Sequence, residues 1–114
     1  MTQVAVIHAA FEDASKTVAF VEVGNREGTE ALEYAYERTN NIAGSWSREA
    51  EFEFRGEIVK NPDFCESVTV MADLPVSKTT GEVMGLRSTS MGDRMVVGNT
   101  CFRVMPFGFD KEEG

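Results

Sequence analysis

A short polar segment near the C-terminus carries side chains that can bind an anion. Arg87, Ser88, Ser90 and Asp93 lie close together in "RSTSMGD". The guanidinium group, the hydroxyls and free backbone N–H groups near Gly92 could hold a phosphate or a carboxylate. In a competing structural interpretation, Ser88 or Ser90 caps a single helical turn and Asp93 accepts hydrogen bonds from backbone amides where a strand begins. No Walker lysine or glycine-rich spacing accompanies the segment, so a nucleotide loop of that type is not indicated.

His8 is the single histidine of the chain, and it has no obvious partner nearby in the sequence. Metal sites and Ser-His or Cys-His catalysis need a histidine with partners, so we expect His8 to be a structural or an exposed residue. Cys65 and Cys101 lack CxxC spacing and are too few for a disulfide framework. We expect both to be free, buried thiols. The sequence therefore predicts no catalytic residue, no metal site and no cofactor.

Acidic residues gather on one side of a predicted helix. Glu30, Glu33 and Glu37, with Tyr34 among them, lie opposite an apolar side. Such a face is either a solvated surface or a docking surface for a basic partner. The pattern gives no sign of the apolar pocket that acid–base catalysis by these carboxyl groups would need.

A loop tryptophan is a second candidate for contact with a partner. Trp46 lies among polar residues, with Arg48 two positions later. A loop tryptophan either fills the core or anchors an interface, and the cost of exposing it favours the core. The predicted partner-binding surface consists of Glu30, Glu33, Tyr34, Glu37, Trp46 and Arg48.

The scaffold that carries these residues is predicted to be of the α+β class. Apolar residues at spacings of three and four predict one main helix over about 27–39. Strands are predicted at 2–11, 17–23, 51–59, 66–76, 94–97 and 100–109, the last two joined by a hairpin turn. We expect the helix to pack on a mainly antiparallel, strongly bent sheet of about five to six strands. The chain is predicted to be a single domain, residues 1–114, with a frayed tail at 109–114.

Composition narrows the classes of partner. The formal net charge is −8, and 42% of the residues are hydrophobic. An acidic chain is a poor direct ligand for nucleic acid, because such binding depends on lysine and arginine. The charge suits a freely soluble protein, or one whose target is basic, such as a nucleic-acid-binding protein. No secretory signal and no membrane-spanning run is visible, so we expect a cytoplasmic protein with no membrane contact.

The segments "RSTSMGDRMVV" and "CFRVMPFGF" together resemble the C-terminal signature of YodL-like domains. Ser88 and Ser90, the Gly92–Asp93 step, the aliphatic run 95–97 and the "GF" at 108–109 carry the resemblance. YodL-like domains are small proteins and modules of bacteriophages and conjugative elements. The resemblance implies an accessory protein of a phage or mobile element, of a kind suspected of acting against host defence or host replication.

Three functions are compatible with the sequence. The favoured one is a small acidic accessory protein that binds and modulates a host protein, by inhibition and without catalysis, in the host cytoplasm. The second is a small-ligand module in which Arg87, Ser88, Ser90 and Asp93 hold an anion such as a nucleotide. The third is a structural component of a virion. A homodimer is compatible with the favoured function.

Overall fold

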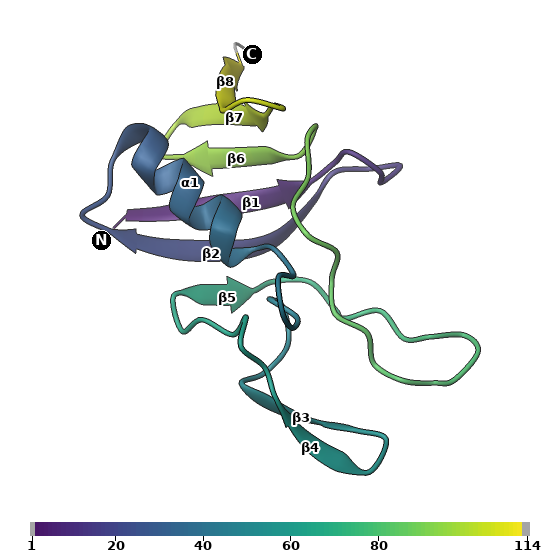
Figure 1. Cartoon of the computed structure of the whole chain (residues 1–114). Helices are drawn as coiled ribbons and strands as arrows, with labels where there is room; N and C mark the ends of the chain where they lie inside the picture. Colours follow the sequence, from purple (N-terminus) through teal and green to yellow (C-terminus); the bar gives the residue numbers. More distant parts are fainter. Residues whose placement is uncertain (1, 113–114) are drawn as a thin grey trace.

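A computed structural model describes residues 2–112 (Figure 1). Six strands form one antiparallel sheet in the order β5-β2-β1-β6-β7-β8, and β3 and β4 form a separate pair. The strands are β1 Thr2–His8, β2 Lys16–Gly24, β3 Glu51–Phe54, β4 Glu57–Lys60, β5 Val68–Val70, β6 Arg94–Val97, β7 Thr100–Val104 and β8 Phe109–Glu112. The one helix among these residues is α1, Gly28–Arg38. This confirms the predicted α+β class, with one helix on a mainly antiparallel sheet.

The centre of the sheet is built from alternating residues. Along β1, Val4, Val6 and His8 are buried, while Ala5 and Ile7 between them are half-buried. Successive side chains of a strand point to opposite faces, so one face of β1 packs inward. β1 pairs with β2 on one side and with β6 on the other. The N-terminal and C-terminal parts of the chain therefore meet in the middle of the sheet.

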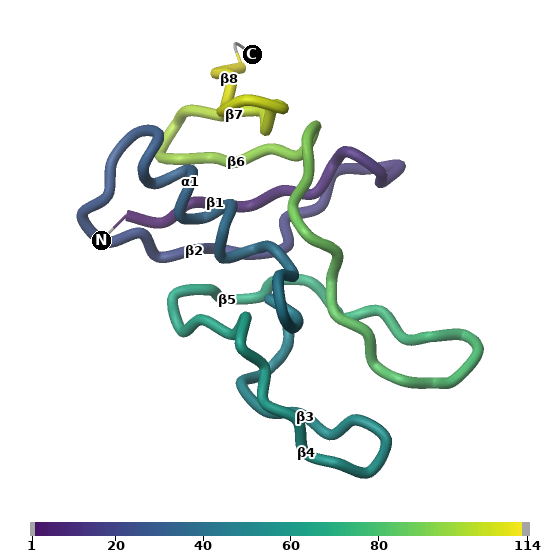
Figure 2. Tube along the Cα trace, in the orientation of Figure 1, coloured from purple at the N-terminus to yellow at the C-terminus, as the bar shows by residue number. Residues whose placement is uncertain are grey.

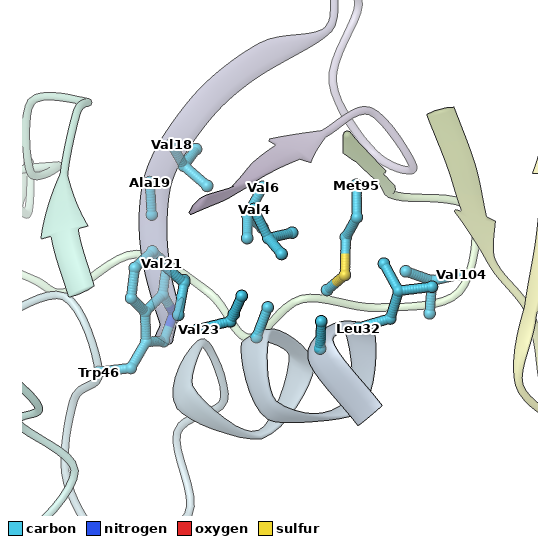
Figure 3. Close-up of a cluster of buried hydrophobic side chains, with 12 residues drawn as sticks. Val4, Val6, Val18, Ala19, Val21, Val23, Leu32, Trp46, Met95 and Val104 are labelled. Carbon is cyan, nitrogen blue, oxygen red and sulfur yellow. The ribbon is translucent and has the colours of Figure 1, made fainter. Parts of the chain in front are cut away.

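Helix α1 covers one face of the sheet (Figure 1). Its acidic first turn and Arg38 in its last turn both suit the helix dipole. The buried residues Ala31, Leu32 and Ala35 pack on the inward side chains of the strands. Figure 3 shows Leu32 facing this cluster and Trp46 closing one end of it. The full core is Val4, Val6, Val18, Ala19, Val21, Val23, Ala31, Leu32, Ala35, Trp46, Met95 and Val104.

The segment 51–59 is a hairpin, where one continuous strand was predicted. Arg55 and Gly56 have positive φ angles of 53° and 84° and join β3 to β4. Two such residues form the tight turn that matches the twist of a β-hairpin. Phe52 then pairs with Val59 across the hairpin. The alternating pattern was interpreted correctly as strand, but an arginine in the turn hid the chain reversal.

The C-terminal segment is also more ordered than predicted. Phe109–Glu112 forms strand β8 along β7, so the predicted frayed tail is wrong for these residues. Residues 113–114 of that tail lie outside the described residues. β8 pairs Asp110 with Arg103 across the strands, and Arg94 and Arg103 both contact Glu112. The charged residues of this segment had suggested a frayed end, but Glu112 forms cross-strand ion pairs that hold β8 in the sheet.

Within residues 2–112, no helix has the length and apolar character needed to cross a membrane. The chain trace in Figure 2 shows the sheet and helix at one end, and the β3–β4 hairpin and the 75–84 loop extending from the other.

Candidate functional site

Asp93, directly before β6, is a fully buried carboxylate. Its two oxygens accept five hydrogen bonds: from the amides of Ala9, Ala10 and Ser90, and two from the guanidinium group of Arg87. Burial alone would raise the pKa of Asp93. The hydrogen bonds from Arg87 and the three amides outweigh burial and hold its pKa at about 2. Asp93 is therefore a charged group with a complete set of partners.

Arg87 is the counterion of this carboxylate, and its donors are all in use. Nη1 donates to Asp93 and to the carbonyl of Ser88, and Nη2 donates to Asp93 and to Glu12. The remaining donor, Nε, bonds Glu12 at 3.2 Å. The hydrogen bonds to Asp93 raise the pKa of Arg87, and those from Arg87 lower the pKa of Glu12. A guanidinium group has five N–H donors, so no donor remains for a further anion.

His8 belongs to a second chain of hydrogen bonds. Its Nε2 lies 3.1 Å from Oγ1 of Thr89. That hydroxyl donates to Oγ1 of Thr39, which donates to the carbonyl of Ala35 in α1. Because the Thr89 hydrogen is committed to Thr39, Thr89 can only accept from His8, and the neutral ring therefore carries its proton on Nε2. Burial, with Arg87 nearby, lowers the pKa of His8, so the ring is neutral near pH 7.

We call these six residues the clasp: His8, Glu12, Thr39, Arg87, Thr89 and Asp93. The clasp joins the end of β1, the β1–β2 loop, the C-terminal end of α1 and the segment before β6. His8, Thr39, Thr89 and Asp93 are all buried, so water and substrate do not reach them. A hydroxyl close to an imidazole is the arrangement of a nucleophile and its base, but Thr89 is only 1% exposed. This geometry supports a structural role.

The structural interpretation of Asp93 is confirmed, because Asp93 does accept backbone amides where β6 begins. The predicted cap is not formed: residues 87–93 contain no helical turn, and Ser88 Oγ instead accepts the amide of Asn41. Ser90 Oγ points to the carbonyl of Ser88. His8 is a buried structural residue, which is one of the two expected alternatives. Its partners Thr89 and Asp93 lie more than 80 residues away in the sequence.

The predicted helix surface carries mixed charge in the structure. Glu30, Glu33 and Glu37 are exposed, as an outer helix face should be. Tyr34 between them is covered by two cations, with the guanidinium carbons of Arg26 and Arg38 at 3.8 Å and 5.2 Å from the centre of its ring. Its hydroxyl donates to Ser67 at 3.0 Å. The two arginines offset part of the acidic charge, and Tyr34 serves the fold as well as the surface.

Trp46 is a core residue, which corrects its place in the predicted partner-binding surface. Its side chain is buried, and its indole N–H donates to the carbonyl of Arg87 at 2.8 Å. The ring meets His8 edge-on at 6.2 Å. Trp46 is therefore unavailable to a partner, and it packs against the clasp. Arg48 is half-buried, with its guanidinium carbon 3.8 Å from the ring centre of Phe52.

Two side chains hold the 41–50 loop to the segment after β4. The side-chain Nδ2 of Asn61 donates to the backbone carbonyls of Ser45, Arg48 and Glu49. Its Oδ1 accepts a hydrogen bond from the backbone amide of Ser45. Asp63 Oδ2 accepts three consecutive backbone amides, from Ile42, Ala43 and Gly44. A carboxylate seated in successive N–H groups is a strong local constraint. These contacts fix the base of the β3–β4 hairpin, and sequence spacing gave no signal for them.

The hairpin and the neighbouring 75–84 loop extend away from the sheet (Figures 1 and 2). We call them together the arm. Arg48, which precedes the hairpin, donates from Nη1 to the carbonyl of Val83 in the 75–84 loop. Arg55 in the hairpin turn lies 3.7 Å from Glu82, and this exposed ion pair links the two parts of the arm. Large apolar side chains of the arm are 39–69% exposed. These residues, the arm surface, are Phe54, Ile58, Val59, Val76, Val83 and Met84.

Cys65 and Cys101 are free and half-buried, less buried than predicted. Among residues 2–112, no three His, Cys, Asp or Glu side chains gather as ligands for a metal ion.

In comparisons with known proteins, no family model, no curated protein and no solved structure matches the chain. The resemblance to YodL-like domains therefore stays a prediction, and any functional conclusion depends on the geometry described above.

Proposed function

We propose that this chain is a non-enzymatic accessory protein that binds another protein through the arm surface. One observation carries the proposal: hydrogen bonds hold the base of the arm in place, although the apolar side chains of the arm do not belong to the hydrophobic core. Its exposed apolar residues lie outside the hydrophobic core, whereas Asn61 and Asp63 fix its base through many hydrogen bonds. A lone two-stranded hairpin is only marginally stable in water, so these contacts keep it in one conformation. A preformed apolar surface is what protein recognition uses.

The chemistry of the clasp supports the non-enzymatic part of the proposal. The clasp has the titratable side chains that a catalytic site would use, but its His8, Thr89 and Asp93 are buried and already hydrogen-bonded. The anion-binding alternative at Arg87 and Asp93 has less support. The guanidinium donors are taken, and one arginine beside the carboxylates of Glu12 and Asp93 leaves the cluster negative.

The resemblance to YodL-like domains and the net charge of −8 support the identity of the partner class. We propose an origin in a phage or another mobile element and a bacterial host protein as the target, bound and inhibited in the host cytoplasm. A basic target, such as a nucleic-acid-binding protein, suits the charge. In this proposal the arm surface and Arg48 supply the principal contact, and Glu30, Glu33 and Glu37 add long-range attraction. No observation favours the virion component, which predicts a stable large homo-oligomer in light scattering.

Affinity capture from a bacterial lysate tests the proposal. The arm variant carries serine at three exposed apolar positions, Phe54, Ile58 and Met84. We expect the wild-type chain to retain one specific protein and the arm variant to lose it. Loss of three apolar contacts in one interface lowers affinity by a factor of about a hundred or more.

A matched control removes equally exposed apolar side chains elsewhere. It carries serine at Phe11, Met71 and Met91, which are 75%, 52% and 57% exposed and lie outside the arm. The arm variant should unfold at the same temperature as the wild type. The control loses the contact of the Phe11 ring with the Arg87 guanidinium group, 4.9 Å away, so its unfolding temperature should fall by no more than about 5 °C. Equal capture by the arm variant and the control would contradict the proposed surface.

A further inference from the structure

A hollow of about 190 Å³ lies between α1 and the turn that joins β7 to β8. Glu33 and Tyr36 of the helix form one wall. The rings of Tyr36 and Phe109 meet edge to face, with centroids 6.3 Å apart. The other lining residues are Val104, Met105, Pro106 and Gly108. The lining therefore combines aromatic and aliphatic side chains with polar groups, and Glu33 is its one acidic residue.

This combination is complementary to an organic cation. Aromatic rings attract an ammonium or guanidinium group through the negative charge of their faces. The carboxylate of Glu33 adds a direct opposite charge, and the aliphatic and aromatic side chains of the lining suit a short hydrocarbon stem. Glu33 and the chain's net charge of −8 repel an anion. A neutral group gains no electrostatic attraction from the aromatic faces or from the Glu33 carboxylate. The lining thus distinguishes cations from other ligands of the same shape.

The turn at the rim of the hollow is held in a fixed shape. The amide of Met105 donates to the carbonyl of Gly108 at 3.0 Å, and Gly108 has a φ angle of 82°. Phe107, between two lining residues in sequence, is 97% exposed. An aromatic ring with almost no contact to its own chain, next to an aromatic hollow, is available to cover a ligand there.

We propose that this hollow binds an ammonium or guanidinium group carried on a short apolar stem. The source favoured by the proposed function is a lysine or arginine side chain of the protein partner, and a free alkylamine has the same chemistry. Only the choice of source rests on the proposed function. The hollow is separate from the arm and can be tested without any partner protein.

Titration of the ¹⁵N-labelled chain, followed by amide chemical shifts, is the test. The probes are N-acetyl-lysine amide, its neutral analogue N-acetyl-norleucine amide, which lacks the amino group, and butylammonium as a free amine. We expect saturable shifts at residues 33–36 and 104–109 with the lysine derivative and none with the norleucine derivative. Butylammonium that binds as tightly as the lysine derivative would support a free-amine site; tighter binding of the lysine derivative would support a side-chain site.

Two matched variants test the role of the carboxylate. Glu33→Gln should weaken binding of the lysine derivative by a factor of about three, the effect expected for an exposed ion pair. Glu30→Gln removes the same charge from the same helix, but Glu30 does not line this hollow, so affinity should stay unchanged. Equal shifts with lysine and norleucine derivatives, equal effects of the two variants, or no shifts at all would overturn the proposal. Any of these results would leave the capture experiment with the arm variant unaffected.

Discussion

Arg87 and Asp93 form a two-point ion pair, Nη1 to Oδ2 at 2.7 Å and Nη2 to Oδ1 at 2.8 Å. The same carboxylate accepts the amides of Ala9 and Ala10 after β1. One buried group therefore ties the β1–β2 loop to the segment before β6. This contact lies where β1 ends and β6 begins, so the Arg87–Asp93 ion pair stabilises the pairing of these two central strands.

Asp93→Asn should lower the free energy of unfolding by about 3 kcal/mol, the usual cost of breaking a buried ion pair. The amide group of asparagine replaces an oxygen acceptor with a donor that faces Arg87 and backbone amides. Urea denaturation measures the change. Asp13→Asn, at an exposed carboxylate, should change the value by less than about 0.5 kcal/mol. A cost below about 1 kcal/mol for Asp93→Asn would contradict this account of the clasp.

Stability should fall with acid in two stages, first through His8 and then through paired carboxylates such as Asp93 and Glu12. The folded-state pKa of His8 lies below its ordinary value of 6.5, so the unfolded chain binds a proton first, and stability is lost as pH falls below about 6.5. The pKa of Asp93 drops from 3.8 to about 2 on folding, so its contribution is lost between those values. That contribution is about 2 kcal/mol above pH 4.

Unfolding measured at pH 7 and pH 5 isolates the first step, because His8 is the only histidine. His8→Gln keeps an N–H donor for Thr89 and cannot titrate, so its stability should change much less over this interval. If the wild type and His8→Gln lost stability equally between pH 7 and pH 5, the neutral, buried state of His8 would be wrong.

Gly92 and Gly98 offer a matched pair of turn glycines. Both have positive φ angles, 92° and 57°. An added Cβ at Gly92 would lie 3.2 Å from the Cβ of Ala10, whereas Gly98 faces open space. Gly98→Ala should cost about 1 kcal/mol from backbone strain alone, and Gly92→Ala should cost more, because Ala10 is held beside Asp93. Thermal unfolding of the two variants checks this order, and equal costs would contradict it.

Asn61→Ala should release the arm without unfolding the sheet. It removes the side-chain contacts of Asn61 and leaves the amide of Ser45 and the carbonyls of Arg48 and Glu49 without these partners. We expect a loss of about 2 kcal/mol, confined to the arm and its base. Amide hydrogen exchange should become faster at 49–60 and stay unchanged in β1 and β6. Asn25→Ala, at an exposed turn position, is the control. Uniformly faster exchange across the sheet would show that Asn61 stabilises the whole fold rather than the arm.

The sequence was informative where local pattern decides the structure. The helix, the β1–β2 hairpin and the β6–β7 hairpin follow from apolar spacing and turn residues over short distances. The role of Asp93 as an acceptor of backbone amides follows from its place before a strand, but its burial and its link to the β1–β2 loop do not. The contact of His8 with Thr89 was not predictable in this way, because it forms only after β1 and β6 pair. For Trp46 the sequence was partly informative. Its residue type indicated either the core or an interface, and the fold places it in the core.

The β3–β4 hairpin was missed for a different reason. Its turn at Arg55–Gly56 lacks the asparagine or aspartate that usually precedes glycine in such turns, so a left-handed arginine was not expected. The exposed apolar residues that alternate along it were interpreted as half-buried. Their exposure became visible only when β3 and β4 paired with each other and not with the large sheet.

Site-specific photo-crosslinking in a bacterial lysate tests the proposed contact most directly. A photoreactive side chain at Ile58 or Met84 places the probe on the arm surface, and one at Met91 places an equally exposed probe outside it. A probe at Glu37 reports on the acidic helix face. We expect one adduct of the same mass from Ile58 and Met84 and none from Met91. An adduct from Glu37 alone, or no adduct from either arm position, would contradict the arm as the principal binding surface.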